Sequence, residues 1–351
     1  MAQVDAVRSA VTLRYPDPDG RLAAVRLVSD LFKRGEPPAF ERAGDDAWEL
    51  TLDRLPVDRL EYRLELVDAG GEAELALDPE ADVVEGPFGA ASSLPLPGYE
   101  PPAWLDADAP AGPVQPLELP SRSLRAPVTG LLWSAAGVEA GEPAPLLVVH
   151  DGPEYAEYAA LLRFLDAAVA GGELPPHRAA LLAPLERDEH YSASARYTRA
   201  LARELLPALA GPAPTPAGQR FRVGLGASLG ALALLHAHRL QPGSFGALVL
   251  QSGSFFQGRT DPHERAFPRF ARIARFVRTV LRAPAFAWPV PVALTCGAGE
   301  ENLANNRALH AALLAQGYPT VLLEHPDAHT WTGWRDALQP ALPRLLGDVW
   351  A

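Results

Sequence analysis

The sequence predicts an α/β domain with a mostly parallel sheet and helices on both faces, preceded by an all-β domain. Two patterns lead to this prediction. In residues 1–92, short runs alternate apolar and polar side chains and are separated by turn-rich segments. From residue 126 to residue 351, near-continuous apolar runs of strand length alternate with segments of helical pattern. Period-two alternation is typical of strands with one buried face, whereas continuous apolar strands between helices are typical of a buried parallel sheet.

Residues 1–92 are expected to form an antiparallel β-sandwich. Turn-rich pieces, such as residues 16–20 and 68–71, separate its alternating runs, which are 11–15, 24–28, 48–52, 62–67 and 74–77. We find no cluster of acids, bases or metal ligands in this segment of the sequence, so we expect the chemistry elsewhere.

Residues 93–125 are so rich in proline that we expect a linker rather than an internal strand or helix. The domain that follows spans residues 126–351. Its expected strands are 128–133, 146–149, 179–182, 221–225, 247–250, 292–295 and 320–323, with helices near 155–170, 196–209, 229–239, 302–316 and 335–347. In such a sheet, chemistry is expected at the carboxyl ends of the strands.

Charge and cysteine content narrow the class of protein. The formal net charge of −12 argues against nucleic acid or an anionic membrane as a partner. Cys296 is the only cysteine, so no internal disulfide can form, and its apolar run predicts a buried structural thiol. The N-terminus lacks the apolar core of a signal peptide and no run is long enough to span a membrane, so we expect a cytoplasmic protein.

The segment Gly226-Ala-Ser228-Leu-Gly230 has the G-x-S-x-G pattern of a nucleophile elbow. An expected strand precedes it and an expected helix follows it, which is the context that an elbow requires. We therefore predict that Ser228 is an acyl-accepting nucleophile. The alternative is a glycine-rich turn with a solvated serine.

A serine nucleophile needs a histidine base, which a carboxylate orients. In α/β-hydrolases these follow in the chain order Ser, Asp/Glu, His. Glu300 follows the expected strand 292–295 and His329 follows the last one, so we expect them to be the acid and the base. Glu301, Asp327 or a Ser–His dyad remain alternatives for the acid. Of the other histidines, His150 and His190 stand at strand ends, which leaves a substrate contact open for both.

Two N–H donors are needed for an oxyanion hole. We expect Leu229, directly after the nucleophile, and either Asp151 or Gly152 in the loop after 146–149. Four aromatic residues near strand ends are expected to bind substrate by stacking on an aromatic acyl group; these are Tyr155, Phe255, Trp331 and Trp334. No lysine of a P-loop, complete dinucleotide fingerprint or compact metal-ligand spacing is present, so we expect no cofactor and no metal.

Several of these motifs together resemble the enterochelin (ferric enterobactin) esterase family, within the esterase D-like α/β-hydrolases. They are His150-Asp-Gly152, the loop 187–191, the elbow, Gln251-Ser-Gly-Ser254-Phe-Phe, the segment 297–306 and His329-Thr-Trp-Thr-Gly-Trp334-Arg335. The resemblance covers essentially the whole chain. It implies an immunoglobulin-like N-terminal domain ahead of an α/β-hydrolase domain.

This resemblance also implies an activity, which is hydrolysis of the serine trilactone esters of a catecholate siderophore in the cytoplasm. Ser228, Glu300 and His329 match the family's nucleophile, acid and base. The substrate would be a small polyanionic ester, a ferric siderophore, and a local positive rim would have to come from Arg187, Arg196, Arg259 and Arg335. A feruloyl or other acyl esterase, an acyltransferase of the same fold and a non-catalytic ligand-binding module are the alternatives. A homodimer, with the N-terminal sandwich packed across it, is left open.

Overall fold

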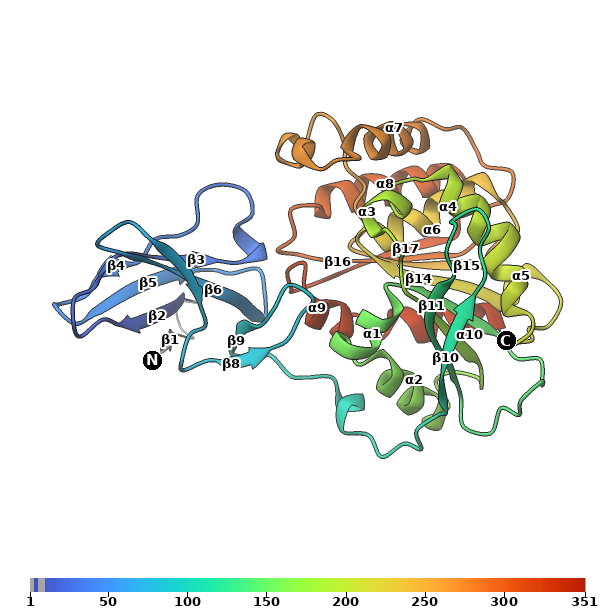
Figure 1. The fold of residues 1–351 in the computed structure, drawn as a ribbon, viewed down its shortest axis with the longest axis horizontal. Coiled ribbons are helices and arrows are strands. Elements are labelled where there is room, and N and C mark those ends of the chain that lie inside the picture. The colour runs from blue at the N-terminus through green and yellow to red at the C-terminus, as the bar shows by residue number, and fades with distance from the viewer. Residues whose placement is uncertain (1–2, 6–9, 351) are drawn as a thin grey trace. The chain divides into compact units, whose positions relative to one another are not determined.

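The computed structural model describes residues 3–5 and 10–350, and the chain divides into two compact units (Figure 1). Unit 1 consists of Met1–Glu100, Gly297–Glu301 and His325–Gly333. Unit 2 consists of Pro101–Cys296, Asn302–Glu324 and Trp334–Ala351. Residues 1–2 and 6–9 of the expected N-terminal domain, and residue 351, lie outside the described part of the chain.

The N-terminal strands of unit 1 form two sheets that share one core. The first sheet has the order β1-β2-β5-β4 and the second the order β3-β6-β9-β8, with β7 paired to β6. Leu13 and Trp48 from the first sheet pack with Leu27 and Leu64 from the second. The described strand pairs of these two sheets are antiparallel, so the all-β prediction is confirmed. The strands are β1 (Gln3–Asp5), β2 (Ala10–Pro16), β3 (Leu22–Val28), β4 (Glu41–Arg42), β5 (Ala47–Asp53), β6 (Arg59–Asp68), β7 (Ala73–Ala76), β8 (Asp82–Val84) and β9 (Ala91–Pro95).

Residues 93–125 differ from the expected linker because strands occupy part of them. β9 extends to Pro95 and lies between β6 and β8. β10 (Val114–Leu119) pairs with β11 (Val128–Ser134) at one edge of the larger sheet. An edge position tolerates Pro116, which has no N–H to donate to a further strand. Proline content therefore excluded an internal strand here but not an edge strand.

Unit 2 is built on a sheet with the order β10-β11-β13-β12-β14-β15-β16-β17. The pairs from β13 through β12, β14 and β15 to β16 are parallel, and β10 and β11 pair antiparallel. Every residue of β12 to β16 except Arg222 is buried, as continuous apolar strands predict. Cys296, in β16, is buried as expected. The remaining strands are β12 (Leu146–His150), β13 (Arg178–Leu182), β14 (Arg222–Ala227), β15 (Ala247–Gln251), β16 (Val292–Gly297) and β17 (Thr320–His325).

Helices cover both faces of this sheet, with α1, α2 and α10 on one face and α4, α6, α7 and α8 on the other (Figure 1). The predicted α/β fold is therefore confirmed. The helices are α1 (Gly152–Tyr158), α2 (Leu161–Ala170), α3 (Arg187–His190), α4 (Ala195–Ala200), α5 (Leu206–Leu209), α6 (Leu229–Leu240), α7 (Phe270–Leu281), α8 (Leu303–Ala315), α9 (Trp331–Asp336) and α10 (Ala341–Trp350).

Three expected helices are each divided in the structure. In the segment 196–209, a π-helical stretch, Leu201–Leu205, separates α4 from α5. The segment 155–170 breaks into α1 and α2 at Ala160, whose φ of 47° is left-handed and cannot continue a helix. The segment 335–347 divides into α9 and α10 around Pro340, because proline lacks the N–H that helix continuation requires. Among the described residues, no helix is long and apolar enough to cross a membrane.

Candidate active site

Ser228 occupies a sharp turn between β14 and α6. Its φ of 53° and ψ of −118° lie outside the ordinary regions for a non-glycine residue, as an elbow requires. A Cβ atom at Gly226 would lie 2.8 Å from the carbonyl carbon of Gly230, so the strand and the helix approach too closely for a side chain there. Ser228 is half-buried, whereas its neighbours on both sides are buried. The turn therefore brings the serine, rather than its neighbours, to the surface.

The end of β15 and the segment that follows it hold the elbow through backbone and side-chain hydrogen bonds. The N–H of Ser228 donates to the carbonyl of Gln251 at 2.9 Å, and the N–H of Ser254 donates to the carbonyl of Ser228 at 3.1 Å. The two hydroxyl oxygens of Ser228 and Ser254 are 3.0 Å apart. Ser254 is buried, so its hydroxyl is a fixed neighbour of the Ser228 hydroxyl.

Asn302, directly before α8, and residues of α8 and α9 in turn hold this segment. Asn302 Nδ2 donates to the carbonyl of Ser252 at 2.9 Å, and Asn306 Nδ2 donates to the carbonyl of Gly253 at 3.1 Å. Trp334 Nε1 donates to Ser252 Oγ at 2.9 Å. Ser252 has a φ of 48°, and these bonds to the surrounding structure stabilise that unusual backbone.

The first turn of α6 packs against the loop after β12. A Cβ atom at Gly230 would lie 3.2 Å from His150 Cβ and 3.3 Å from Asp151 Oδ2, so the loop and the helix N-terminus are in close contact. Leu229 is the first residue of α6 and Gly152 the first of α1, and neither N–H has an acceptor within its own helix. The N–H of Asp151 makes a long bond of 3.4 Å to the Tyr191 hydroxyl.

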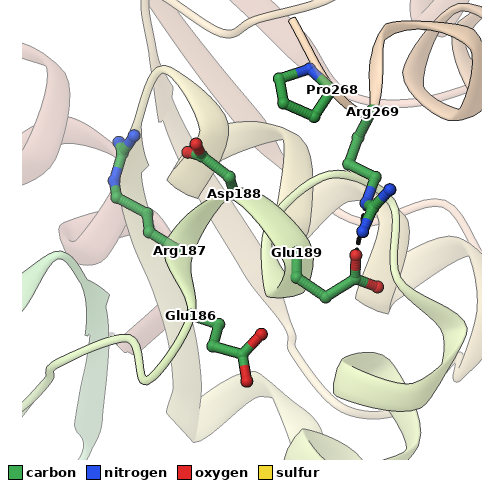
Figure 2. Close-up of a pocket in the computed structure, with 6 residues that line it drawn as sticks. All are labelled: Glu186, Arg187, Asp188, Glu189, Pro268 and Arg269. Carbon is green, nitrogen blue, oxygen red and sulfur yellow. Dashed lines mark hydrogen bonds and ion pairs between the residues drawn. The ribbon is translucent and has the colours of Figure 1, made fainter.

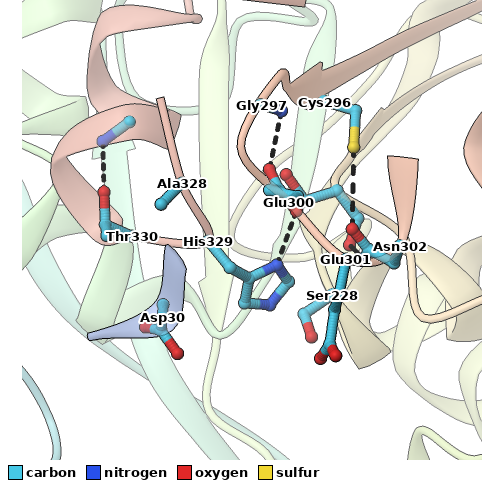
Figure 3. Close-up of polar contacts among 12 residues, drawn as sticks. Asp30, Ser228, Cys296, Gly297, Glu300, Glu301, Asn302, Ala328, His329 and Thr330 are labelled. Atoms are coloured by element: carbon cyan, nitrogen blue, oxygen red, sulfur yellow. Dashed lines mark hydrogen bonds and ion pairs between the residues drawn. The ribbon is translucent and has the colours of Figure 1, made fainter. Parts of the chain in front are cut away.

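In unit 1, His329 and Glu300 form a hydrogen-bonded pair (Figure 3). His329 Nδ1 lies 2.8 Å from Glu300 Oε2, and the N–H of Gly297 donates to Glu300 Oε1 at 2.7 Å. The Glu300 side chain is fully buried, whereas that of His329 keeps 20% of its surface exposed. A buried carboxylate with two donors can orient an imidazole for proton transfer.

The other two acidic candidates have different partners. Asp327 Oδ2 accepts a bond from Arg59 Nη2 at 2.7 Å. Glu301 has its carboxylate 3.7 Å from Arg34 Nε. Glu300 is thus the acid that lies against His329 in unit 1.

Comparison with known proteins identifies the family. The Esterase family model, described as "Putative esterase", matches residues 135–345. The chain belongs to this esterase family. A curated relative, Iron(III) enterobactin esterase from Dickeya dadantii (strain 3937), is 31% identical over 228 residues. That match covers 62% of this chain and 52% of the relative, so it spans about half of the relative's length.

Solved structures extend the likeness of this esterase to nearly the whole chain. An enterochelin esterase from Shigella flexneri matches with a TM-score of 0.77 and 21% identity, covering 97% of this chain and 93% of that one. A ferric enterobactin esterase from Salmonella typhimurium matches with a TM-score of 0.79 and 21% identity, covering 99% and 96%. At these identities the matches establish a shared fold. The predicted resemblance is thus confirmed for the family and for the fold. Membership of an esterase family also agrees with the prediction that the protein is a carboxylic ester hydrolase.

Two of the aromatic residues expected to bind substrate are in the core of the esterase instead. Tyr155 and Phe255 are fully buried, and the Tyr155 hydroxyl donates to Gln251 Oε1 at 2.7 Å. Trp334 is also buried and supports Ser252, as described above. All three side chains therefore pack against protein in this structure, and a sequence pattern does not show whether an aromatic ring points into the core or toward a ligand. Trp331 is half-buried, so stacking on a substrate stays a prediction for it.

The histidines left open as substrate contacts are also structural. His150 is fully buried, with Nε2 3.0 Å from the Tyr197 hydroxyl, and burial lowers its pKa to about 4. His190 is buried and stacks on the ring of Tyr197. Burial of the His190 imidazole lowers its pKa as well. Both imidazoles are therefore neutral parts of the core.

Arg187 is held by a carboxylate of its own unit. Its Nε and Nη2 atoms donate to the two oxygens of Asp151, each at 2.8 Å. It lines a hollow of about 410 Å³, which also contains Glu186, Asp188, Glu189, Pro268 and Arg269 (Figure 2). Arg269 pairs with Glu189 at 2.5 Å. The lining carries both signs of charge, so this hollow is not the basic pocket that a polyanionic substrate calls for.

Ser254 and the asparagines behind it are not among the site residues predicted from the sequence. The available signal was the place of Ser254 in the motif Gln251-Ser-Gly-Ser254-Phe-Phe, three residues after the end of β15, at the edge where Ser228 follows β14. That signal does not reveal which of the hydroxyls after β15 lies against the nucleophile.

Proposed function

We propose that this esterase hydrolyses carboxylic esters through a triad of Ser228, His329 and Glu300. The observation that carries the proposal is the 2.8 Å contact between His329 Nδ1 and Glu300 Oε2, because it gives one of the nine histidines an orienting carboxylate. The chain order Ser, Glu, His is that of α/β-hydrolases. Ser228 comes directly after β14 and Glu300 three residues after β16, and these parallel strands end at the same edge of the sheet.

The proposed reaction is acyl transfer in two steps. His329 Nε2 takes the proton of the Ser228 hydroxyl while its Nδ1–H donates to Glu300, which stabilises the imidazolium. Ser228 Oγ attacks the ester carbonyl, and the tetrahedral intermediate collapses as His329 protonates the leaving alcohol. Water then attacks the acyl-enzyme by the same route, which releases the acid and restores the Ser228 hydroxyl.

Two backbone donors in unit 2 are proposed to stabilise the oxyanion. Leu229 and Gly152 are each the first residue of a helix, and the contacts at Gly230 bring their segments together. Asp151 remains an alternative to Gly152, although its N–H already has the Tyr191 hydroxyl as a distant acceptor. Donors fixed before reaction stabilise developing charge without reorganisation.

The substrate that we propose is an ester of a catecholate siderophore. The name of the 31% identical relative, Iron(III) enterobactin esterase, supports this class. Trp331, half-buried and two residues after the proposed base, is the aromatic residue that we propose stacks on a catechol ring. A cytoplasmic site of action is part of the same proposal, since a ferric siderophore releases its iron after uptake.

Hydrolysis assays test both parts of the proposal. Ser228→Ala should lower kcat on a p-nitrophenyl ester by several orders of magnitude while the thermal unfolding curve stays unchanged. Near-wild-type turnover by that variant would overturn the triad.

The wild type is then compared on a ferric catecholate trilactone, on its iron-free form and on a feruloyl ester. Preference for either trilactone supports the siderophore class, whereas preference for the feruloyl ester, or equal weak rates on all three, contradicts it.

A further inference from the structure

The β-sandwich of unit 1 makes a buried ion pair with the loop that carries His329. Arg59, the first residue of β6, has a side chain that is only 3% exposed, and its Nη2 donates to Asp327 Oδ2 at 2.7 Å. Nη1 donates to the Tyr99 hydroxyl at 3.2 Å, and Nε lies 3.3 Å from the Glu61 carboxylate. The guanidinium is thus held by β6 and its surroundings on one side and by Asp327 on the other.

Asp327 connects this arginine to both loops of the proposed acid–base pair. Its Oδ1 accepts the N–H of Ala328, the residue before His329, at 2.8 Å. Its backbone carbonyl accepts the N–H of Gly299, the residue before Glu300, at 3.0 Å. A displacement of Asp327 would therefore move the backbone next to both His329 and Glu300.

Further contacts seat these loops on the sandwich. The N–H of Asp58 donates to the carbonyl of Pro326 at 2.7 Å, and Arg34 Nη2 donates to the carbonyl of Glu301 at 2.8 Å. At Gly299, a Cβ atom would lie 2.6 Å from Leu31 Cδ1 and 3.0 Å from Val57 Cγ1. The sandwich thus contacts the segments on both sides of the pair.

A buried ion pair of this kind is better suited to fixing a geometry than to adding stability. Desolvation of both charges offsets much of their attraction, so replacement by apolar residues is often neutral. Removal of one partner alone leaves an uncompensated buried charge. The Arg59–Asp327 pair therefore contributes mainly a defined position for Asp327.

We propose that Arg59 is a positioning residue for the esterase reaction, acting through Asp327 to keep His329 aligned with Glu300. The N-terminal sandwich then serves the chemical step itself. This inference rests on the proposed triad. It identifies no new group that touches substrate, since Arg59 acts only through the loop that it holds.

The test compares Arg59→Met and Arg59→Lys with Arg26→Met in the full chain, by steady-state kinetics on a p-nitrophenyl ester. Arg26 is the matched control, because it belongs to the same sandwich and pairs with Glu65 at 2.6 Å on the surface. We expect Arg59→Met to lower kcat about 100-fold with KM nearly unchanged, the size of effect that a small misplacement produces. Arg59→Lys should recover part of the loss, and Arg26→Met should behave as wild type.

The double variant Arg59→Met/Asp327→Asn separates positioning from stability. It removes both charges, so its melting temperature should exceed that of Arg59→Met while kcat stays low. Recovery of kcat together with stability, or wild-type kcat in a folded Arg59→Met, would overturn the proposal. If Arg59→Met does not fold, kcat of Arg59→Lys and of the double variant replaces it. Values below wild type in these folded variants support the proposal, and wild-type kcat in both overturns it. Ser228→Ala is assayed in parallel. Activity in that variant would overturn the triad, whereas an inactive Ser228→Ala together with wild-type kcat in Arg59→Met would overturn only the role of Arg59.

Discussion

Individual side chains decide the proposed chemistry, and the clearest example is the choice of acid. Glu300 and Glu301 are adjacent in the sequence and both follow β16. In the structure, Glu300 lies against His329 and is fully buried, whereas Glu301 lies near Arg34 and is partly exposed. A pattern of residue types cannot separate two neighbouring glutamates, because the direction of each side chain depends on the turn between them.

The different surroundings of Glu300 and Glu301 predict different effects of replacing each one by glutamine. Glu300→Gln should lower kcat by about 10³- to 10⁴-fold, because an amide does not stabilise the imidazolium and can hold the wrong tautomer. Glu301→Gln should retain kcat within a few-fold. Steady-state kinetics on a p-nitrophenyl ester measure both. A larger loss in Glu301→Gln than in Glu300→Gln would reverse the assignment.

Ser254 gives a second prediction about a single side chain. Its hydroxyl lies 3.0 Å from that of Ser228, so Ser254→Ala removes one hydrogen bond from the proposed nucleophile. We expect kcat to fall by about five-fold, equivalent to about 1 kcal/mol for one bond. Ser244→Ala, which removes a buried hydroxyl bonded to the carbonyl of Gln241, is the control and should leave kcat unchanged. Equal kcat values in both variants would exclude a role for Ser254 in orienting Ser228.

The β14–α6 elbow depends on a close approach between a strand and a helix. Gly226→Ala would place a Cβ atom 2.8 Å from the Gly230 backbone, so we expect it to destabilise the fold by about 1–3 kcal/mol and to lower kcat. At Gly347, within α10, no atom lies within 4 Å of the Cβ position apart from the chain neighbours and the backbone of the same helix. Gly347→Ala should therefore stabilise the protein by about 0.5–1 kcal/mol. Denaturant unfolding of both variants checks this, and destabilisation by Gly347→Ala would contradict it.

Elements with a strong local pattern could be predicted from the sequence, and elements that depend on distant partners could not. The elbow and the buried strands β12 to β16 follow from local residue types. β10 escaped prediction because Pro116 is tolerated only at a sheet edge, and edge position is a property of the whole sheet. The Arg59–Asp327 pair joins residues 268 positions apart, so no local pattern indicates it.

Over the whole molecule, buried neutral histidines make stability depend on pH. Burial lowers the pKa values of His150, His177, His236 and His238 to about 4, from an ordinary value of 6.5. Between pH 6.5 and 4 the unfolded chain therefore binds more protons than the folded one, so the free energy of unfolding falls as the pH falls. Each histidine contributes up to about 3 kcal/mol to this loss.

His177 offers a direct check, since it is packed between the rings of Trp133 and Trp350. His177→Phe keeps an aromatic ring there and removes the titrating group. The free energy of unfolding of this variant should fall less steeply between pH 6.5 and 4 than that of the wild type, as measured by guanidinium denaturation at several pH values. Parallel curves for the two proteins would contradict a neutral buried His177.

Covalent labelling shows whether Ser228 is an activated nucleophile. A fluorophosphonate probe reacts only with a serine whose hydroxyl an adjacent base activates. We predict one label per wild-type chain, located by peptide mass spectrometry at Ser228, and none in the folded Ser228→Ala variant. An unlabelled wild type, or a label at Ser254 or another serine, would show that Ser228 is not the activated nucleophile.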